Sequence, residues 1–388
     1  MTKNKDPFIV FGAPVIGDEE IVEVIKCLES RWLGTGPRVA EFEKEFSIYK
    51  GVVDSAAVNS CTAALHLSLI ASGVKPGDEV ITTAMTFCAT VNTIIHVGAK
   101  PILIDVERNT QNLDTSLIES SITHKTKAIV VVHFAGFPCD MESVMKIADK
   151  YHLKVIEDCA HAIETECQGK KAGTIGDFGC FSFYSTKNIV TGEGGMVIAK
   201  NPDDLSAIRK LSLHGMSKHA WNRFSSSGYK HYDVELPGYK YNMMDLQAAI
   251  GLAQIRKVEK FQLRRKEIWN YYSSNLLGLP LTVPNNELLK LDVHAHHLYT
   301  IQIDSAVSSI SRDGFLQKMT ESGIGVGVHY LSIPTHSYYQ KEFGWNPLDW
   351  PISLEIGNQT VSLPLTPGLS DLQVEKVVEA VIGIFANG

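Results

Sequence analysis

Long apolar runs are missing from this chain of 388 residues. No stretch approaches the roughly 18 uninterrupted apolar residues that a membrane-spanning helix needs, so we expect no membrane partner. The N-terminal segment also lacks an apolar signal core before its first proline, Pro7. These two absences predict a protein that is neither inserted in a membrane nor secreted.

Paired cysteines are missing as well. The seven cysteines are scattered, odd in number and contain no C-x-x-C pair. This pattern argues against a zinc ribbon and fits reduced thiols in a cytoplasmic protein. We therefore predict a cytoplasmic location and no metal site.

Basic runs are the third absence. The chain has 36 Lys and Arg against 43 Asp and Glu, a formal net charge of −7, and no run of five or more basic residues. An acidic balance of this kind argues against a nucleic-acid partner.

The first two-thirds of the chain instead alternates helix-like and strand-like segments. Near-continuous Val and Ile runs predict strands that are covered on both faces, and hence a mostly parallel sheet between helical layers, an α/β fold. The strands are expected at residues 52–58, 79–83, 101–106, 127–134 and 153–158. Helices are expected at 18–30, where Ile21, Val22, Ile25 and Leu28 share one face, and at 62–73, 86–98, 115–123 and 141–151.

The length allows two domains. Residues 244–277 predict a long helix, broken near its middle, that leads into a smaller α+β domain. That domain is expected to contain strands at 296–303 and 324–330 and helices at 312–323 and 371–385. We place the boundary near residue 255, with a large domain of residues 1–255 and a small C-terminal domain of residues 256–388.

Lys187 is the most informative single residue. An apolar run, 178–184, reads as a buried strand and delivers this lysine into a turn that contains Gly192, Gly194 and Gly195. Burial lowers the pKa of an ammonium group, so such a lysine can act as an amine nucleophile. The chemistry that most often needs this is Schiff-base formation, above all with pyridoxal phosphate (PLP). A solvated surface lysine is the alternative.

Three further features follow predicted strands, at the edge where doubly wound sheets bind ligands. The segment NSCTAAL (59–65) offers the backbone N–H groups of Thr62 and Ala63 to a phosphate, or is a plain helix cap. Asp158 ends a strand and could pair with a pyridine nitrogen, or cap the next helix. His161 could face the same cavity. Phe87 could stack on a planar cofactor, or belong to the core. Together these residues supply what PLP requires.

The order of motifs resembles that of the DegT-type sugar aminotransferases. The matching segments are RWLGTGPRVAEFE (31–43), NSCTAAL (59–65), TTAMTF (82–87), IEDCAHA (156–162), FSFYSTKNIVTGEGG (181–195), PGYKYNMMDLQAAIGLAQ (237–254) and GVGVHY (325–330). The resemblance covers essentially the whole chain. It implies the fold of type I PLP-dependent transferases, which is similar to that of aspartate aminotransferase, with a large domain around a mixed, mostly parallel sheet and a smaller α+β domain.

The resemblance also implies roles for individual residues. Lys187 would hold PLP as the internal aldimine and move protons, Asp158 would pair with the pyridine nitrogen, and Phe87 would lie against the ring. The phosphate would be bound by Thr62, Ala63 and Ser182, and by Asn242 from the neighbouring subunit of a homodimer. His161 would lie near the cofactor. His329, Thr35 and Gly36 would lie near the nucleotide-sugar substrate.

The expected reaction is ping-pong transfer of an amino group from glutamate to a nucleotide-linked keto sugar. The segments 214–216, 235–242, 293–301 and 325–339 resemble the branch that aminates C4 of UDP-linked sugars for lipid A or surface glycans. Three alternatives stay open: C3 amination on a dTDP or GDP carrier, a PLP-dependent sugar dehydratase, and a non-catalytic PLP-binding sensor or scaffold. Lys187 disfavours the dehydratase, because relatives that remove a hydroxyl carry histidine at this position.

Two kinds of segment suggest other sites. The glycine-rich segments 34–39 and 323–328 do not complete G-x-G-x-x-G between a strand and a helix, which argues against NAD. His294, His296 and His297 lack the spacing of a metal site, and we interpret them as structural or surface residues.

Overall fold

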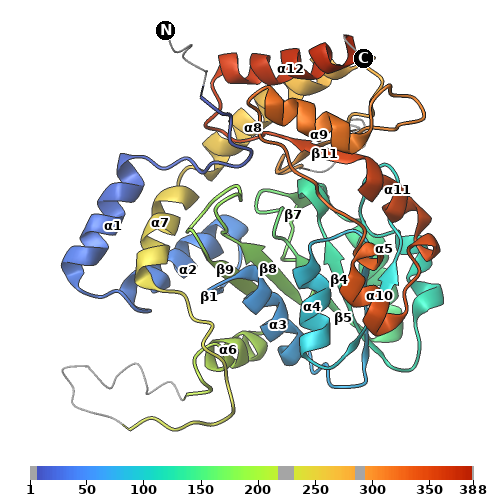
Figure 1. Cartoon of the computed structure of the whole chain (residues 1–388). Coiled ribbons are helices and arrows are strands. Elements are labelled where there is room, and N and C mark those ends of the chain that lie inside the picture. Colours follow the sequence, from blue (N-terminus) through green and yellow to red (C-terminus); the bar gives the residue numbers. More distant parts are fainter. Residues whose placement is uncertain (1–6, 217–230, 285–292, 387–388) are drawn as a thin grey trace.

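The computed structural model describes residues 7–216, 231–284 and 293–386. At its centre is a seven-stranded sheet with helices on both faces (Figure 1). The strand order is β1-β9-β8-β5-β4-β2-β3. These strands are β1 (Ala56–Val58), β2 (Glu79–Thr83), β3 (Lys100–Ile104), β4 (Thr126–Val132), β5 (Lys154–Asp158), β8 (Phe178–Ser182) and β9 (Gly195–Ala199).

The sheet is mixed and mostly parallel. β2, β3, β4, β5 and β8 pair in parallel, and β9 pairs antiparallel with both β8 and β1. β9 therefore runs against the other six strands. The α/β class and the predicted sheet are confirmed.

Successive side chains of a strand point to opposite faces of the sheet, so each strand contributes to a core on either side. Val130, Ile156 and Cys180 pack on one side of the sheet, under α3 and α6. Val155 and Phe181 pack on the other side, under α5 and under α2 with α7. These helices are α2 (Pro37–Lys50), α3 (Cys61–Ala71), α5 (Met141–Tyr151), α6 (Pro202–Leu211) and α7 (Asp245–Ile255). Coverage on both faces explains the near-continuous Val and Ile runs in the sequence.

A second core forms towards the C-terminus. The predicted long helix breaks at Arg256 and Lys257, and its second half packs on a two-stranded antiparallel sheet with two further helices. These elements are α8 (Val258–Leu276), β10 (Tyr299–Gln302), α9 (Arg312–Glu321), β11 (Thr360–Leu363) and α12 (Asp371–Ala386).

Contacts cross the predicted domain boundary in both directions. Ile9, near the N-terminus, belongs to the second core. Conversely, the segment with α10 (Ser337–Phe343) and α11 (Pro351–Gln359) packs back on the large sheet, where the indole N–H of Trp350 donates to the carbonyl of Leu103 at 3.0 Å. The division into residues 1–255 and 256–388 stays a prediction.

Two predicted elements are wrong. Residues 115–123 form two short 3₁₀ turns, η1 (Thr115–Leu117) and η2 (Glu119–Ser121), instead of a helix. The hydroxyls of Ser120 and Ser121 both donate to the Leu117 carbonyl at 3.0 Å, and such side-chain bonds compete with a regular helix.

Residues 324–330 make isolated bridges instead of a strand: Ile324 pairs with Ile9, and Gly327 pairs with Ser362. The two glycines in this segment weaken a strand because they have no side chain to pack.

The first helix, α1 (Asp18–Ser30), lies alongside α7 at one side of the molecule (Figure 1). It turns Glu20, Glu23 and Cys27 inward. Its apolar face points outward instead, with exposures of 51%, 45%, 47% and 51% for Ile21, Val22, Ile25 and Leu28. An apolar face exposed in this way commonly marks an interface.

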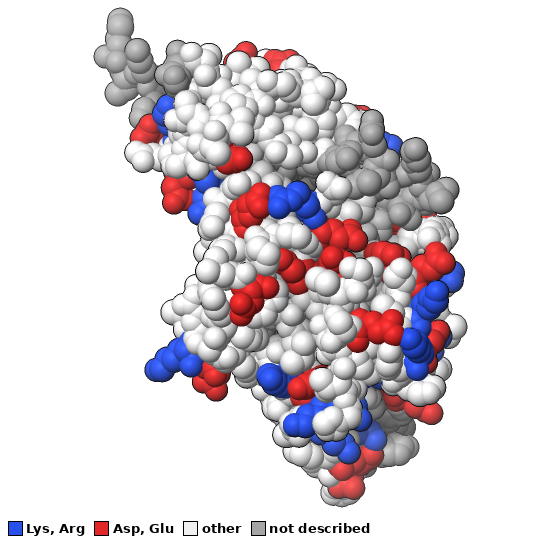
Figure 2. Space-filling view, turned by 90° about the vertical axis from the view of Figure 1, so that its right-hand side faces the viewer, with Lys and Arg blue, Asp and Glu red and all other residues white. Residues whose placement is uncertain are grey.

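In the part of the chain that the structure describes, no helix is both long and apolar enough to cross a membrane. On the face shown in Figure 2, basic side chains are scattered among acidic ones and do not form one basic area.

Candidate active site

A cavity of about 370 Å³ lies beyond the carboxyl ends of the parallel strands, a usual volume for a small-ligand site. Its walls come from the turns after β1, β2, β5 and β8 and from one segment near the C-terminus. The residues predicted from the sequence that line it are Thr62, Phe87, Asp158, His161, Ser182, Lys187 and His329.

Lys187 enters this cavity from the turn that follows β8. The turn is closed by the Lys187 N–H, which donates to the Tyr184 carbonyl at 2.9 Å. Burial lowers the pKa of the Lys187 ammonium to about 8, against the opposing effects of Cys61 and Asp158. A sizeable fraction of this lysine is therefore neutral amine at mildly alkaline pH, the form that attacks carbonyl groups.

Asp158 is the last residue of β5 and is 5% exposed. Its Oδ2 accepts a hydrogen bond from the Thr90 hydroxyl at 2.8 Å, and its Oδ1 accepts from the Ala160 N–H at 3.1 Å. Burial raises the pKa of the Asp158 carboxyl, and the bond from Thr90 opposes this rise. A buried carboxylate with few charged partners suits a cationic group such as a protonated pyridine nitrogen.

Hydroxyl groups and the N-terminus of α3 form another wall. Thr62 is exposed in the first turn of α3, and the Ser182 Oγ accepts from the Tyr184 N–H at 3.3 Å, so that its own proton can be donated. These groups suit a phosphate. The Ala63 N–H already donates to the Ser60 Oγ at 3.1 Å, and Ala63 is buried. A phosphate would have to share that N–H with Ser60.

The aromatic residues of the cavity differ in burial. Phe87 precedes α4 (Cys88–His96) and is 57% exposed, so its ring is not part of the core. His161 is buried, and burial together with the charge of Lys187 lowers its pKa well below the usual value. The His329 Nδ1 lies 2.8 Å from the Ser362 hydroxyl, and burial lowers the pKa of His329 to about 4. Both histidines are therefore neutral at pH 7.

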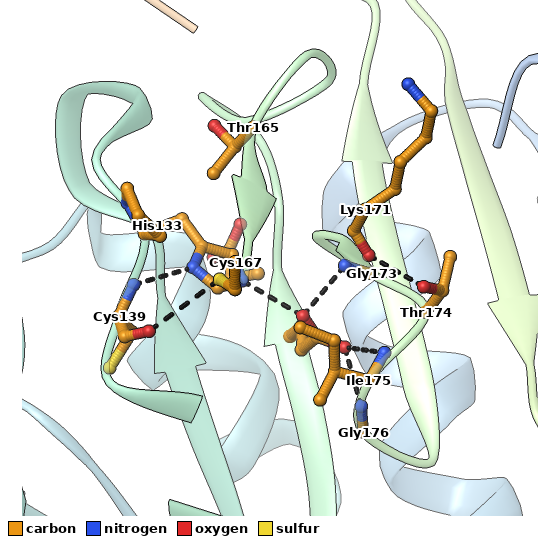
Figure 3. Close-up of polar contacts among 12 residues, drawn as sticks. His133, Cys139, Thr165, Cys167, Lys171, Gly173, Thr174, Ile175 and Gly176 are labelled. Atoms are coloured by element: carbon orange, nitrogen blue, oxygen red, sulfur yellow. Dashed lines mark hydrogen bonds and ion pairs between the residues drawn. The ribbon is translucent and has the colours of Figure 1, made fainter. Parts of the chain in front are cut away.

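Glu157 anchors the strand that carries Asp158. Adjacent strand residues point to opposite faces, so Glu157 lies behind the cavity. Its carboxylate accepts from the N–H groups of Gly173, Ile175 and Gly176 at 2.7–2.8 Å and lies 3.0 Å from the His133 Nε2 (Figure 3). These bonds hold β5 against the loop that leads to β8.

His133, Glu157 and Cys159 come close enough to hold a metal ion. However, the Cys139 N–H donates to the His133 Nδ1 at 3.0 Å, and the other ring nitrogen of His133 faces Glu157 (Figure 3). Both ring nitrogens of His133 are thus already engaged in hydrogen bonds, and we assign this cluster a structural role.

Asn188 supports the lysine from behind. Its Nδ2 donates to both carboxylate oxygens of Glu164, at 3.0 and 2.8 Å, and to the Ala295 carbonyl at 2.9 Å. Its Oδ1 lies 2.8 Å from the His297 Nδ1. This buried network places His297 beside the site, and His294 and His296 pack around Trp269. The three histidines are buried residues of the interior rather than surface residues.

Thr35, Gly36 and Asn242 do not line the cavity. They lie together near the starts of α2 and α7, where the Asn242 Nδ2 donates to the Thr35 hydroxyl at 2.5 Å and that hydroxyl donates to the Met243 carbonyl at 2.5 Å. The structure therefore separates the predicted site residues into a cavity group and this outer group.

Several cavity residues were missed by the sequence analysis. Thr86 and Thr90 sit one helical turn apart and hydrogen-bond to each other at 2.9 Å, and Thr90 holds Asp158. Their spacing of four residues at the start of an expected helix was an available signal. Tyr184 and Tyr330 also line the cavity, and each stands near a residue that was predicted.

The fold and the site define a class of protein. A buried carboxylate, a lysine with a lowered pKa, an exposed aromatic ring and a helix N-terminus with hydroxyls share one cavity at the switch edge of a mixed α/β sheet. These residues fit PLP, and the protein is a PLP-dependent enzyme of fold type I.

Comparison with known proteins gives the family. The DegT/DnrJ/EryC1/StrS aminotransferase family matches residues 14–382, and the chain belongs to it. Its cofactor is PLP. The chain is 46% identical over 384 residues to the spore coat polysaccharide biosynthesis protein SpsC of Bacillus subtilis, with 98% of each chain covered.

Solved structures of sugar aminotransferases are also similar to this chain. A putative sugar aminotransferase from Streptococcus pneumoniae, solved in its PLP and PMP forms, is 32% identical with a TM-score of 0.90, over 98% of this chain and 98–99% of that chain. PseC of Helicobacter pylori, an aminotransferase involved in the biosynthesis of pseudoaminic acid, is 28% identical with a TM-score of 0.90 and covers 98% of this chain and 100% of its own.

Proposed function

We propose that this sugar aminotransferase moves an amino group from glutamate to the C4 keto group of a UDP-linked sugar, for the synthesis of surface polysaccharide or lipopolysaccharide. The observation that carries the proposal is the cavity in which Lys187, with its pKa lowered to about 8, lies with the buried Asp158. The relatives support the sugar and the pathway class, because one is named for spore coat polysaccharide and another for pseudoaminic acid.

The residues of the chain divide the work of the reaction. When bound, PLP supplies an electron sink next to the reacting carbon. Lys187 accepts and returns a proton at Nζ, which its lowered pKa permits near neutral pH. Asp158 holds positive charge on the pyridine nitrogen, and Thr90 keeps the Asp158 carboxylate in place through its hydrogen bond. Thr62 and Ser182 would bind the phosphate, and Phe87 would pack on the ring.

We further propose a homodimer with shared active sites. Two features support it: the apolar face of α1 is exposed, and the outer group with Asn242 and Thr35 lies outside the cavity of its own chain. In a symmetric dimer the same surface of each subunit meets its counterpart, so one interface can bring both outer groups to the two partner cavities. The proposed role of Asn242 is to bind the cofactor phosphate of the partner subunit.

We also propose that the enzyme acts in the cytoplasm. None of the seven cysteines forms a disulfide, and most are buried. Cysteines that form no disulfides are typical of a reducing compartment.

The test follows the absorption band of the PLP-loaded enzyme. We expect glutamate to shift the band as the cofactor passes from its aldehyde form to its amine form. A UDP-linked 4-keto sugar should then restore the original band. Lys187→Ala is the control, which should show neither change.

Any other result would contradict a different part of the proposal. Restoration only by a dTDP- or GDP-linked 3-keto sugar would show that the regiochemistry and carrier are wrong. A band that glutamate leaves unchanged would refute the donor. Loss of a sugar hydroxyl without amino transfer would indicate the dehydratase.

A further inference from the structure

Tyr330 is a cavity residue whose hydroxyl is oriented by the chain itself. It follows His329 and lines the same cavity as Lys187 and Phe87. Its ring packs edge-on to Phe134, with the ring centroids 6.2 Å apart, and lies 6.0 Å from the ring of Phe87. The hydroxyl is 3.0 Å from the His161 Nε2.

The direction of this hydrogen bond follows from the other side of the His161 ring. The Ala135 N–H donates to the His161 Nδ1 at 3.3 Å, so Nδ1 is an acceptor and carries no proton. A neutral imidazole has one N–H, which must then be at Nε2. The Nε2–H therefore donates to the Tyr330 oxygen, and the oxygen is the acceptor in this bond.

This leaves the phenolic proton of Tyr330 to be donated elsewhere. Within the described residues, the hydroxyl makes no hydrogen bond other than the one from His161. A partly buried hydroxyl that accepts one hydrogen bond and still has a proton to donate is stabilised further when an acceptor lies within reach of that proton. Because Tyr330 lines the cavity, we infer that this proton is available to an acceptor there.

We propose that Tyr330 is a ligand-binding residue whose hydroxyl donates a hydrogen bond to an oxygen acceptor in the cavity, and that His161 acts through it as a positioning residue. The acceptor would be either the hydroxyl oxygen carried by the PLP ring or an oxygen of the sugar. The second possibility rests on the proposed function.

The neighbouring network supports a fixed geometry for the pair. The His161 ring lies 4.4 Å from the His297 ring, and the His297 Nδ1 lies 2.8 Å from the Asn188 Oδ1. Asn188 is itself held by Glu164 and by the Ala295 carbonyl. The His161 ring packs on His297, which is held in turn by Asn188. His161 therefore cannot rotate away from the Tyr330 hydroxyl without breaking these buried contacts.

The test is Tyr330→Phe, which removes the hydroxyl and keeps the ring packing. We expect a two- to tenfold loss, the size of one neutral hydrogen bond, in one of two measurements. If the acceptor is the cofactor, the Kd for PLP rises and the absorption band of the resting enzyme shifts. If the acceptor is the sugar, those properties stay at the wild-type value and KM or kcat for the keto sugar changes.

Tyr339→Phe is the matched control. It also removes a tyrosine hydroxyl with one hydrogen bond, to the Asn92 Oδ1 at 2.7 Å, but Tyr339 does not line the cavity. This variant should match the wild type in PLP affinity, resting spectrum and sugar kinetics. A Tyr330→Phe enzyme that matches the control in all three would overturn the proposal.

A double-mutant cycle tests the role of His161. If His161 acts through Tyr330, His161→Ala adds little to the loss already caused by Tyr330→Phe. Fully additive losses would show that His161 acts independently. Failure of the proposed sugar chemistry is a separate result, because it appears in the wild-type enzyme, whereas PLP affinity and the resting spectrum need no sugar.

Discussion

The cavity group and the outer group of predicted site residues differ in how the fold uses them. Lys187 and Asp158 follow strands whose ends meet at one edge of the sheet, and each has a pKa altered by burial. Thr35 and Asn242 sit at helix starts, bond to each other and lie outside the cavity. The difference teaches that one chain gathers Lys187 and Asp158 in one cavity, whereas the role proposed for the outer group requires a second chain.

The largest expected effect is at the centre of the cavity group. Lys187→Ala should lower the rate of amino transfer by about 10⁴-fold or more, because the nucleophile and the proton carrier are the same amine. Steady-state assays measure this loss. Lys154→Ala is the control, since Lys154 pairs with Asp177 at 2.8 Å on the surface and should leave the rate unchanged. Substantial activity without Lys187 would contradict its central role.

Asp158→Asn should have the next largest effect, a fall of about 10²-fold in kcat, because the amide cannot stabilise positive charge on the pyridine nitrogen. Asparagine has nearly the same shape, so the fold should persist. Thermal unfolding and the kinetics are measured together. Near-normal turnover in a folded variant would show that Asp158 only caps the following turn.

Substitutions on the exposed apolar face of α1 test the interface that the proposed role of the outer group requires. The double variant Ile21→Glu/Ile25→Glu should convert the proposed dimer to a monomer, because four charges would have to be buried at a symmetric interface. Sedimentation velocity measures the change. Leu372→Glu is a matched control, because Leu372 is an aliphatic residue on α12 that is 77% exposed. If the variant remains dimeric, α1 does not form the dimer interface.

Asn242→Ala should give a smaller effect, with PLP bound about tenfold more weakly by the dimer, as expected for the loss of a bond to a charged phosphate. Equilibrium dialysis measures the Kd. Asn275→Ala is the control, because Asn275 lies on α8 away from the cavity and its Nδ2 donates to the Tyr271 carbonyl at 2.8 Å. If the PLP affinity is the same in both variants, the outer group has no part in the partner's cavity.

The smallest effect concerns pH. The rate at which PLP-free enzyme captures PLP should rise as the pH increases, with a midpoint near 8, because only the neutral amine of Lys187 attacks the aldehyde. An ordinary lysine would give a midpoint near 10.4. Stopped-flow absorbance measures the rate. A midpoint above 10 would show that burial does not lower the pKa of Lys187 in solution.

Much of this architecture was predictable, because the strands follow from the types of neighbouring residues. The Val and Ile runs define the buried strands, and Asp158 ends one of them. The serine-rich segment 115–123 was misjudged because its apolar period suits a helix, and only the competing side-chain bonds show otherwise.

The parts of the site that could not be predicted depend on residues far apart in the sequence. Asn188 meets Glu164 and His297, and Tyr330 meets His161, across separations of 24 to 169 residues. No local pattern encodes such a meeting. The apolar stripe of α1 was visible in the sequence, but its direction depends on how α1 packs against α7.

The sequence by itself determined most of the strands and helices along the chain and the family to which it is similar, and it singled out Lys187 as the candidate nucleophile, since each depends on the type and spacing of neighbouring residues. Only the tertiary structure decided which residues share the cavity, which residue the Tyr330 hydroxyl contacts and which face of α1 is exposed. These properties arise when distant segments pack together, because burial and hydrogen-bond partners exist only in the folded chain.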